Sequence, residues 1–129
     1  TDAVLIIGDN ALKIIDNGYI TLDLGQSWYE FTGLPFVYAL WVVKRDRRIP
    51  GINNLLKKAK EAGIRSVKAL AVTESQRLQL THERCLNYLT NSIRYDFGEG
   101  EIKGFLTFYQ HAVSLGLAPK GVELVFNES

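Results

Sequence analysis

Two apolar runs limit the folds open to this chain of 129 residues. Residues 4–7 read VLII, and residues 36–43 read FVYALWVV. Side chains alternate between the two faces of a β-strand, so a strand that is apolar at every position is buried on both faces. We therefore predict two central strands, at residues 3–7 and 36–43, in an α/β fold.

Two such strands do not complete a sheet by themselves. A central strand needs a neighbour on each side and a layer over each face. The chain also begins at Thr1 without a methionine. We expect it to be part of a longer protein, in which other strands complete the sheet.

Helical periodicity dominates the second part of the chain. Apolar side chains recur at helical spacing in residues 52–59, 64–71, 85–93 and 102–113. Gly63 either ends one helix or lies where a longer helix bends. Thr81 is a candidate N-cap, and Gly116 with Pro119 ends the last helix. A closing strand is predicted at residues 122–126.

Shorter helices are predicted nearer the amino terminus. Asp9 or Asn10 is placed to cap a helix ending near residue 15. A second helix is predicted at residues 26–31, because Ser27 and Glu30 have the spacing of a capping box. The predicted organisation is therefore part of an α/β lobe in residues 1–48, followed by a helical carboxyl-terminal region in residues 49–129 that packs on the lobes of the longer protein.

The composition argues against several classes of function. A net charge of +1 provides no overall field for nucleic acid or for an anionic membrane. The single cysteine, Cys85, excludes an internal disulfide framework, and its place on an apolar helical face predicts a buried thiol. His82 and His111 lie on different predicted helices, so no metal site is expected. No apolar run approaches the ~18 residues of a membrane span.

The basic run at residues 44–48 is the strongest charged cluster. It contains Lys44, Arg45, Arg47 and Arg48, interrupted by Asp46. Such a run contacts phosphates in some proteins, but here no aromatic side chains alternate with the charges. A solvated connection is the favoured interpretation, and binding to a polyanion is the alternative.

The junction at Gly8 and Asp9 follows the first predicted strand and opens a helix. Ligands of open α/β sheets bind at the carboxyl ends of strands, where a glycine lets them approach the backbone. The carboxylate of Asp9, however, repels the anions that a helix N-terminus attracts. No glycine-rich phosphate-binding motif is present. The residues alone leave Asp9 balanced between a helix cap and a ligand contact.

Three stretches carry a resemblance to a known family. They read DAVLIIGDNAL, LDLGQSWYEFTGLPFVYALWVVKRD and YLTNSIRYDFGEGEIKGFLTFYQHA. In this order they resemble the carboxyl-terminal half of the menaquinone-biosynthesis chorismate dehydratases of the futalosine pathway. The dihydroxynaphthoate synthases of the same pathway are a sister family, and FVYALW favours the dehydratase.

The resemblance implies a type II periplasmic-binding-protein-like fold, with two α/β lobes and the ligand in the cleft between them. It implies a cytoplasmic hydro-lyase that converts chorismate to 3-enolpyruvylbenzoate and uses no cofactor. The positions that match the cleft-facing motifs are Gly8, Asp9, Leu34, Pro35 and Phe36. Asp9 is expected to hydrogen bond to the substrate, and Pro35 with Phe36 to pack against its ring. The catalytic residues are unknown.

The implied partners are a small-molecule carboxylate substrate and the amino-terminal half of the same protein, which is expected to hold the principal catalytic groups. We therefore expect this chain alone to be inactive. Nucleic acid and membranes are not expected partners, and the sequence leaves open whether a homodimer forms. The alternative function on the same fold is a non-catalytic carboxylate-binding protein, either a solute receptor or the effector-binding domain of a regulator.

Overall fold

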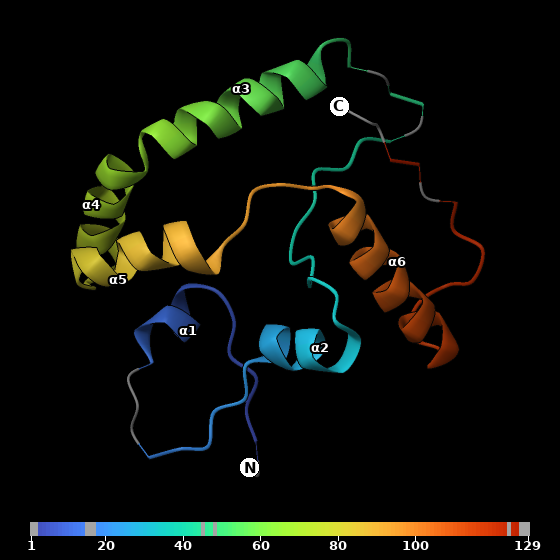
Figure 1. Ribbon diagram of the computed structural model, residues 1–129, viewed down its shortest axis with the longest axis horizontal. Helices are drawn as coiled ribbons and strands as arrows, with labels where there is room; N and C mark the ends of the chain where they lie inside the picture. The colour runs from blue at the N-terminus through green and yellow to red at the C-terminus, as the bar shows by residue number, and fades with distance from the viewer. Residues whose placement is uncertain (1–2, 15–17, 45, 48, 124, 127–129) are drawn as a thin grey trace. The chain divides into compact units, whose positions relative to one another are not determined.

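The computed structural model describes residues 3–14, 18–44, 46–47, 49–123 and 125–126 (Figure 1). The chain divides into two compact units, unit 1 and unit 2. Unit 1 comprises Thr1–Ile20 and Asn54–Tyr95, and unit 2 comprises Thr21–Asn53 and Asp96–Ser129. The elements are α1 (Asp9–Lys13), α2 (Leu24–Thr32), α3 (Ile52–Arg65), α4 (Val67–Leu78), α5 (His82–Asn87), the π-helical turn η1 (Tyr88–Ser92) and α6 (Glu99–Ser114).

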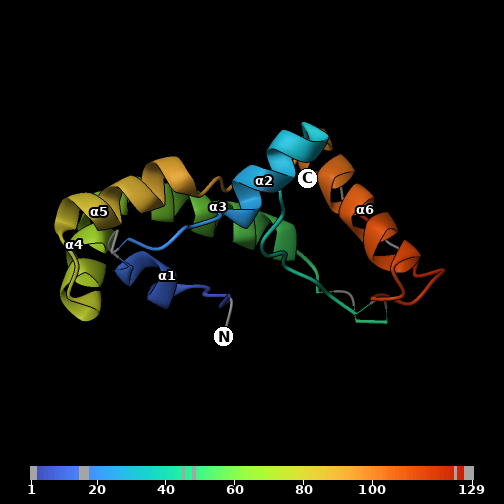
Figure 2. The ribbon, with the colours of Figure 1, turned by 90° about the horizontal axis from the view of Figure 1, so that it is seen from below.

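The core of unit 1 lies where α4 and α5 pack side by side (Figure 2). Ala71 and Leu78 of α4 are buried there, as is Cys85 of α5. The predicted buried thiol is thus confirmed. Thr81 begins α5 as predicted, because its hydroxyl accepts a hydrogen bond from the Arg84 N–H at 3.2 Å.

The boundary between α3 and α4 lies two residues later than Gly63. α3 continues through Gly63 to Arg65, and α4 follows after Ser66 with a change of direction (Figure 1). The Ser66 N–H donates to the carbonyls of Ala62 and Gly63, at 3.0 and 3.1 Å. Two helices are therefore present instead of one bent helix, but the prediction that Gly63 itself ends the first of them is wrong.

The first helix of unit 2 begins earlier than its sequence predicts. α2 is capped by Asp23, whose Oδ1 accepts from the N–H groups of Gly25 and Gln26 at 2.8 and 3.0 Å. The predicted cap, Ser27, lies inside the helix and donates its hydroxyl to the Asp23 carbonyl at 2.8 Å. The capping-box prediction is wrong because a carboxylate one turn earlier satisfies the free N–H groups.

The last helix, α6, has the extent that its periodicity predicts. The Gly98 N–H donates to the Glu101 carboxylate at 2.9 Å, which stabilises the start of the helix. Beyond the helix, the Tyr109 hydroxyl donates to the Pro119 carbonyl at 2.7 Å and accepts from the Val122 N–H at 3.1 Å. In the predicted closing strand, residues 122, 123, 125 and 126 are not in a strand, and Leu124 lies outside the described residues.

The described part of the chain contains no β-strand. Residues 3–7 and 36–43, both predicted as strands, are irregular segments, because a strand requires a hydrogen-bonded neighbour and the described residues supply none. Most of their apolar side chains are exposed, as at Val4 and Trp41. The predicted division at residue 48 concerns the lobes of a longer protein and stays a prediction.

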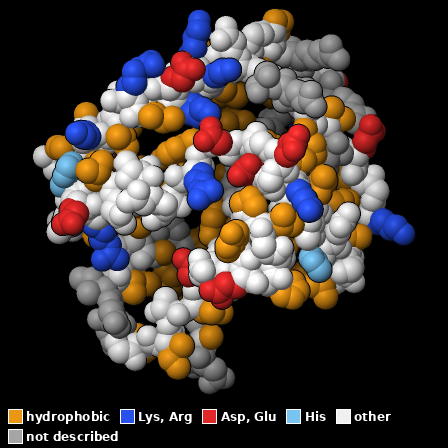
Figure 3. Space-filling model, in the orientation of Figure 1, with side chains coloured by type: hydrophobic (Ala, Val, Ile, Leu, Met, Phe, Trp, Pro, Cys, Tyr) orange, Lys and Arg blue, Asp and Glu red, His pale blue; other side chains and the backbone are white. Residues whose placement is uncertain are grey.

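Apolar surface is abundant on the described residues, and Figure 3 shows many hydrophobic side chains on one face. None of the helices in the described ranges is long and apolar enough to cross a membrane.

Candidate functional site

The Gly8–Asp9 junction in unit 1 is a tight turn into α1. Gly8 is the N-cap, with φ of +63°, a backbone conformation that L side chains rarely adopt. Its carbonyl accepts from the Ala11 N–H at 2.9 Å. Asp9 is the first residue of the helix, and its carboxylate makes no capping hydrogen bond. The interpretation of Asp9 as the cap is therefore wrong.

The Asp9 carboxylate pairs instead with Arg77 of α4. Arg77 Nη2 donates to Asp9 Oδ2 at 3.0 Å, and Arg77 Nε donates to Glu74 Oε2 at 2.7 Å. These hydrogen bonds, to Glu74 first and then to Asp9, raise the pKa of Arg77 above its usual value. The guanidinium therefore remains charged and offsets part of the negative charge at the junction.

Contacts at both ends hold α1, which has only five residues. Arg77 binds its first residue, Asp9, and Arg84 Nη2 donates to the carbonyl of Ile14, just beyond its last turn, at 2.7 Å. Helices this short are marginal in isolation. Two arginines from α4 and α5 thus fix the position of the Gly8–Asp9 junction within unit 1.

A small cavity of about 70 Å³ lies beside this junction. Ligand pockets usually measure about 300–1,000 Å³, so this cavity is too small for a substrate of several rings or groups. Its lining comprises Asp9, Leu12, Glu74, Leu78, Cys85, Tyr88 and Leu89. The cavity at the junction therefore does not enclose such a substrate.

The Leu34–Phe36 segment of unit 2 is fixed by the residues just before it. Gly33 ends α2 in the left-handed conformation, with φ of +67°. The Thr32 hydroxyl donates to the Trp28 carbonyl at 2.7 Å and accepts from the Leu34 N–H at 3.1 Å. This side chain links the last turn of α2 to the predicted substrate-packing segment.

An aromatic cluster surrounds the end of this segment. The ring of Phe36 lies edge-to-face with those of Trp28, Tyr38 and Phe108, at centroid separations of 6.0, 4.9 and 5.1 Å. Such edge-to-face pairs add about 0.5–1.5 kcal/mol beyond the burial of area. Phe36 is therefore held by α2 and by α6 together.

The Trp28 and Phe108 rings also line an apolar groove of about 360 Å³. Among the described residues of its lining, His111 alone has an ionisable side chain, and its ring is edge-on to Trp28 at a centroid separation of 6.1 Å. Trp28 Nε1 is buried and has no hydrogen-bond partner among the described residues. The other lining residues are Phe31, Ala112, Leu115 and Leu117.

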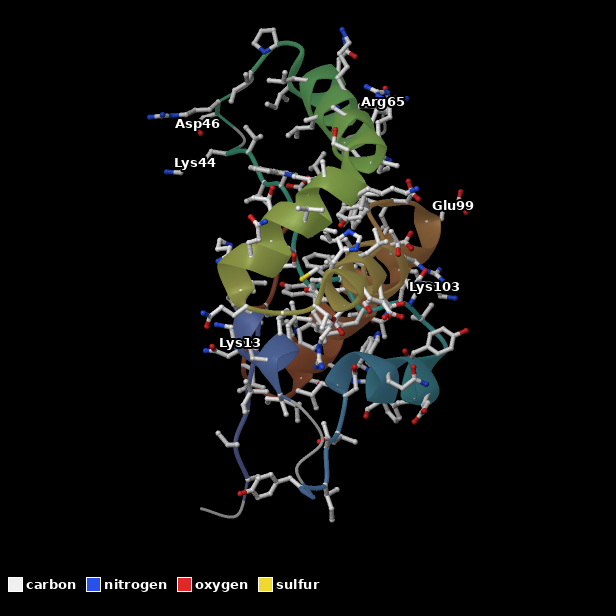
Figure 4. All side chains as sticks on the ribbon, turned by 90° about the vertical axis from the view of Figure 1, so that its left-hand side faces the viewer. Lys13, Lys44, Asp46, Arg65, Glu99 and Lys103 are labelled. Carbon is white, nitrogen blue, oxygen red and sulfur yellow. The ribbon has the colours of Figure 1, made fainter. Side chains whose placement is uncertain are left out.

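The basic run at residues 44–48 is exposed wherever the structure describes it. Lys44 and Asp46 are exposed and point away from their segment (Figure 4), and Arg45 and Arg48 lie outside the described residues. The turn is closed by the Arg47 N–H, which donates to the Lys44 carbonyl at 2.9 Å. Across the described ranges, no group of three His, Cys, Asp or Glu side chains is placed to hold a metal ion.

The five predicted site residues therefore fall into two sets. Gly8 and Asp9 belong to unit 1, whereas Leu34, Pro35 and Phe36 lie together in unit 2. The sequence interpretation missed two residues that contact these sets. For Arg77, the sequence offered only a possible ion pair with Glu74, three residues earlier. For Gly104, which lies against Pro35, it offered only a second glycine four residues earlier in the same helix.

The chain matches the family described as menaquinone biosynthesis over residues 1–114. It therefore belongs to this family, as the three quoted stretches indicate.

Among curated proteins, the chain is similar to a chorismate dehydratase of Thermus thermophilus, with 29% identity over an alignment of 140 positions. The alignment covers 92% of this chain and 49% of the relative, so the chain spans about half the length of that protein. The predicted resemblance to the chorismate dehydratases is thus confirmed at the level of the family. No solved structure matches the chain significantly.

Proposed function

We propose that this chain is part of a chorismate dehydratase, a cytoplasmic hydro-lyase that converts chorismate to 3-enolpyruvylbenzoate in menaquinone biosynthesis by the futalosine pathway. The observation that carries the proposal is the family match over residues 1–114, together with a relative that is named a chorismate dehydratase. Because the chain covers 49% of that relative, the activity is proposed for a family-length protein that contains it.

The reaction balances without an added oxidant or reductant. The C–O bond of the ring hydroxyl breaks, and one ring C–H bond loses its proton. The electron pair of that C–H bond completes the aromatic ring, and the hydroxyl leaves with a proton as water. Aromatisation supplies the driving force, so orientation and electrostatics contribute the catalysis that the protein must provide.

The described residues suit the binding part of this task. Pro35 and Phe36, backed by an aromatic cluster, offer an apolar surface against which a six-membered ring packs. Asp9 offers a carboxylate that accepts a hydrogen bond from a substrate hydroxyl, and Arg77 beside it holds that carboxylate in place. Gly8 keeps the backbone accessible beside that carboxylate.

We further propose the two-lobed periplasmic-binding-protein-like fold for the family-length protein. The support is the exposed apolar surface of the irregular segments at residues 3–7 and 36–43, which strands from the remaining half of such a protein would pair and cover. Amide hydrogen exchange tests this fold. Slow exchange along residues 36–43 in the family-length protein, and fast exchange in this chain alone, is the expected result.

Incubation of the family-length protein with chorismate tests the activity. Chromatography with mass detection should show enzyme-dependent formation of 3-enolpyruvylbenzoate. A sample without protein corrects for the spontaneous breakdown of chorismate, and this chain alone should form no product. If calorimetry shows that chorismate binds but no product forms, the result contradicts the proposed enzymatic activity and favours the non-catalytic carboxylate-binding protein instead.

A further inference from the structure

Gly104 of α6 has no room for a side chain. A Cβ atom built at this position collides with the carbonyl oxygen of Pro35 and lies 3.3 Å from the Pro35 carbonyl carbon. It also lies 3.7 Å from Leu34 Cβ. Because the closest atom belongs to the backbone, no side-chain rotation relieves the collision. Gly104 is also the buried residue of α6.

Gly100, one turn earlier on α6, provides a direct comparison. It faces the same segment, but a Cβ atom there lies 3.9 Å from Pro35 Cγ, an ordinary van der Waals contact. Two glycines of one helix thus approach one proline at different distances. A methyl group fits at Gly100 and does not fit at Gly104.

The segment that rests on Gly104 is held by both α2 and α6 within unit 2. The Thr32 hydroxyl holds the Leu34 N–H on the side of α2. On the side of α6, the segment lies against Gly104 and, at a greater distance, Gly100, and the Phe36 ring contacts Phe108 edge-to-face. A shift of the backbone at Pro35 therefore moves the ring of Phe36 with it.

We infer that Gly104 is a positioning residue for substrate binding, because it lets the Leu34–Phe36 segment lie directly on α6 and so sets where Pro35 and Phe36 meet the substrate ring. This inference rests on the proposed function, in which that segment packs against chorismate. It assigns to the helical tail a part in substrate binding, through a residue that touches no ligand.

The test compares Gly104→Ala with Gly100→Ala in the family-length protein. Displacement of a substrate-packing segment by a fraction of an ångström removes binding in the ground state and the transition state alike, which raises KM more than it lowers kcat. We expect Gly104→Ala to raise KM for chorismate about ten-fold, with a smaller change in kcat. Gly100→Ala should stay within about two-fold of wild type in both constants.

A second variant covers the case in which Gly104→Ala does not fold. Phe108→Leu removes the ring contact with Phe36 without adding atoms, and we expect it to raise KM about two- to ten-fold. Equal KM values for Gly104→Ala and Gly100→Ala in folded, active proteins would overturn the inference and leave the proposed function intact. If Gly104→Ala is unfolded, an unchanged KM in Phe108→Leu overturns it. A wild-type protein that neither binds nor converts chorismate would contradict the proposed function, and the inference with it.

Discussion

Arg77 Nη2 lies 3.0 Å from Asp9 Oδ2, although 68 residues separate the two along the chain. Both side chains are about half exposed, at 55% for Arg77 and 51% for Asp9. Exposed ion pairs contribute little to stability because water and salt screen them. The pair therefore matters more for where it holds the Asp9 carboxylate than for how much it stabilises the fold.

Asp9→Asn should separate a binding role from a structural one. The amide keeps the size of the side chain and one acceptor oxygen, but it removes the negative charge that strengthens a hydrogen bond from a substrate hydroxyl. In the family-length protein we expect a clear rise in KM for chorismate and only a small change in Tm. Steady-state kinetics and thermal unfolding at the same pH measure the two effects.

Arg77→Gln is the matched control, because it breaks the same ion pair and leaves the carboxylate in place. If Asp9 contacts the substrate, Asp9→Asn lowers kcat/KM more than Arg77→Gln does. Equal losses in the two single variants, with no further loss in the double variant, would show that Asp9 acts only through Arg77.

Thr32→Val should loosen the segment that precedes Pro35. The valine has nearly the same shape but leaves the Leu34 N–H without its acceptor, which costs about 1–3 kcal/mol for a buried group and less here, where the bond is partly buried. We expect a lower free energy of unfolding by urea denaturation. Thr90→Val is the control, since the Thr90 hydroxyl only donates, at 2.8 Å, to the Leu86 carbonyl. Equal losses in the two variants would contradict this role of Thr32.

Asp23→Ala should destabilise α2. Its carboxylate accepts two backbone hydrogen bonds at the helix start, and loss of such a cap costs about 1 kcal/mol. Urea unfolding measures the difference. Ser27→Ala, at the cap position predicted from the sequence, should lower the free energy of unfolding by less, because the Ser27 hydroxyl donates to the Asp23 carbonyl and caps no N–H group. The reverse order would restore Ser27 as the capping residue.

Gly63→Ala should stabilise the protein, because Gly63 lies in the interior of α3 and a Cβ atom there meets nothing within 4 Å. Alanine has a higher helix propensity than glycine by about 1 kcal/mol. An increase in Tm, with unchanged kinetics toward chorismate, is the expected result. A decrease in Tm would mean that residue 63 does not lie in the interior of a helix.

Three features that depend only on residues close together in the sequence were predicted correctly. The cap at Thr81, the extent of α6 and the burial of Cys85 all follow from spacing within one or two helical turns, and all three are confirmed. Capping at Asp23 was missed although the residue is adjacent to the helix, because a second acceptable cap, Ser27, followed it.

Contacts between distant segments were beyond prediction from the pattern alone. Nothing in the spacing of Asp9 identifies Arg77 as its partner, and nothing near Pro35 indicates Gly104. The two predicted strands show the same limit in another form. Their apolar composition says that they are buried on both faces, but burial requires partners, which the described residues do not provide.

Tyr95 should make stability depend on pH in the alkaline range. Burial raises the pKa of Tyr95 above the ordinary value of about 10, and repulsion from Tyr88 adds to the shift. Its hydroxyl also donates to the Leu89 carbonyl at 3.3 Å, which only the protonated phenol does. Folding therefore favours the protonated form, so the unfolded chain loses this proton at lower pH than the folded protein.

The contribution of Tyr95 is then fully present below about pH 10 and is lost as the pH rises through the raised pKa. Tyr95→Phe removes a titrating group, so its free energy of unfolding should fall less steeply than that of wild type between about pH 9 and pH 11. Urea unfolding at a series of pH values measures the slope. Identical slopes for Tyr95→Phe and wild type would show that Tyr95 ionises equally easily in the folded and the unfolded protein.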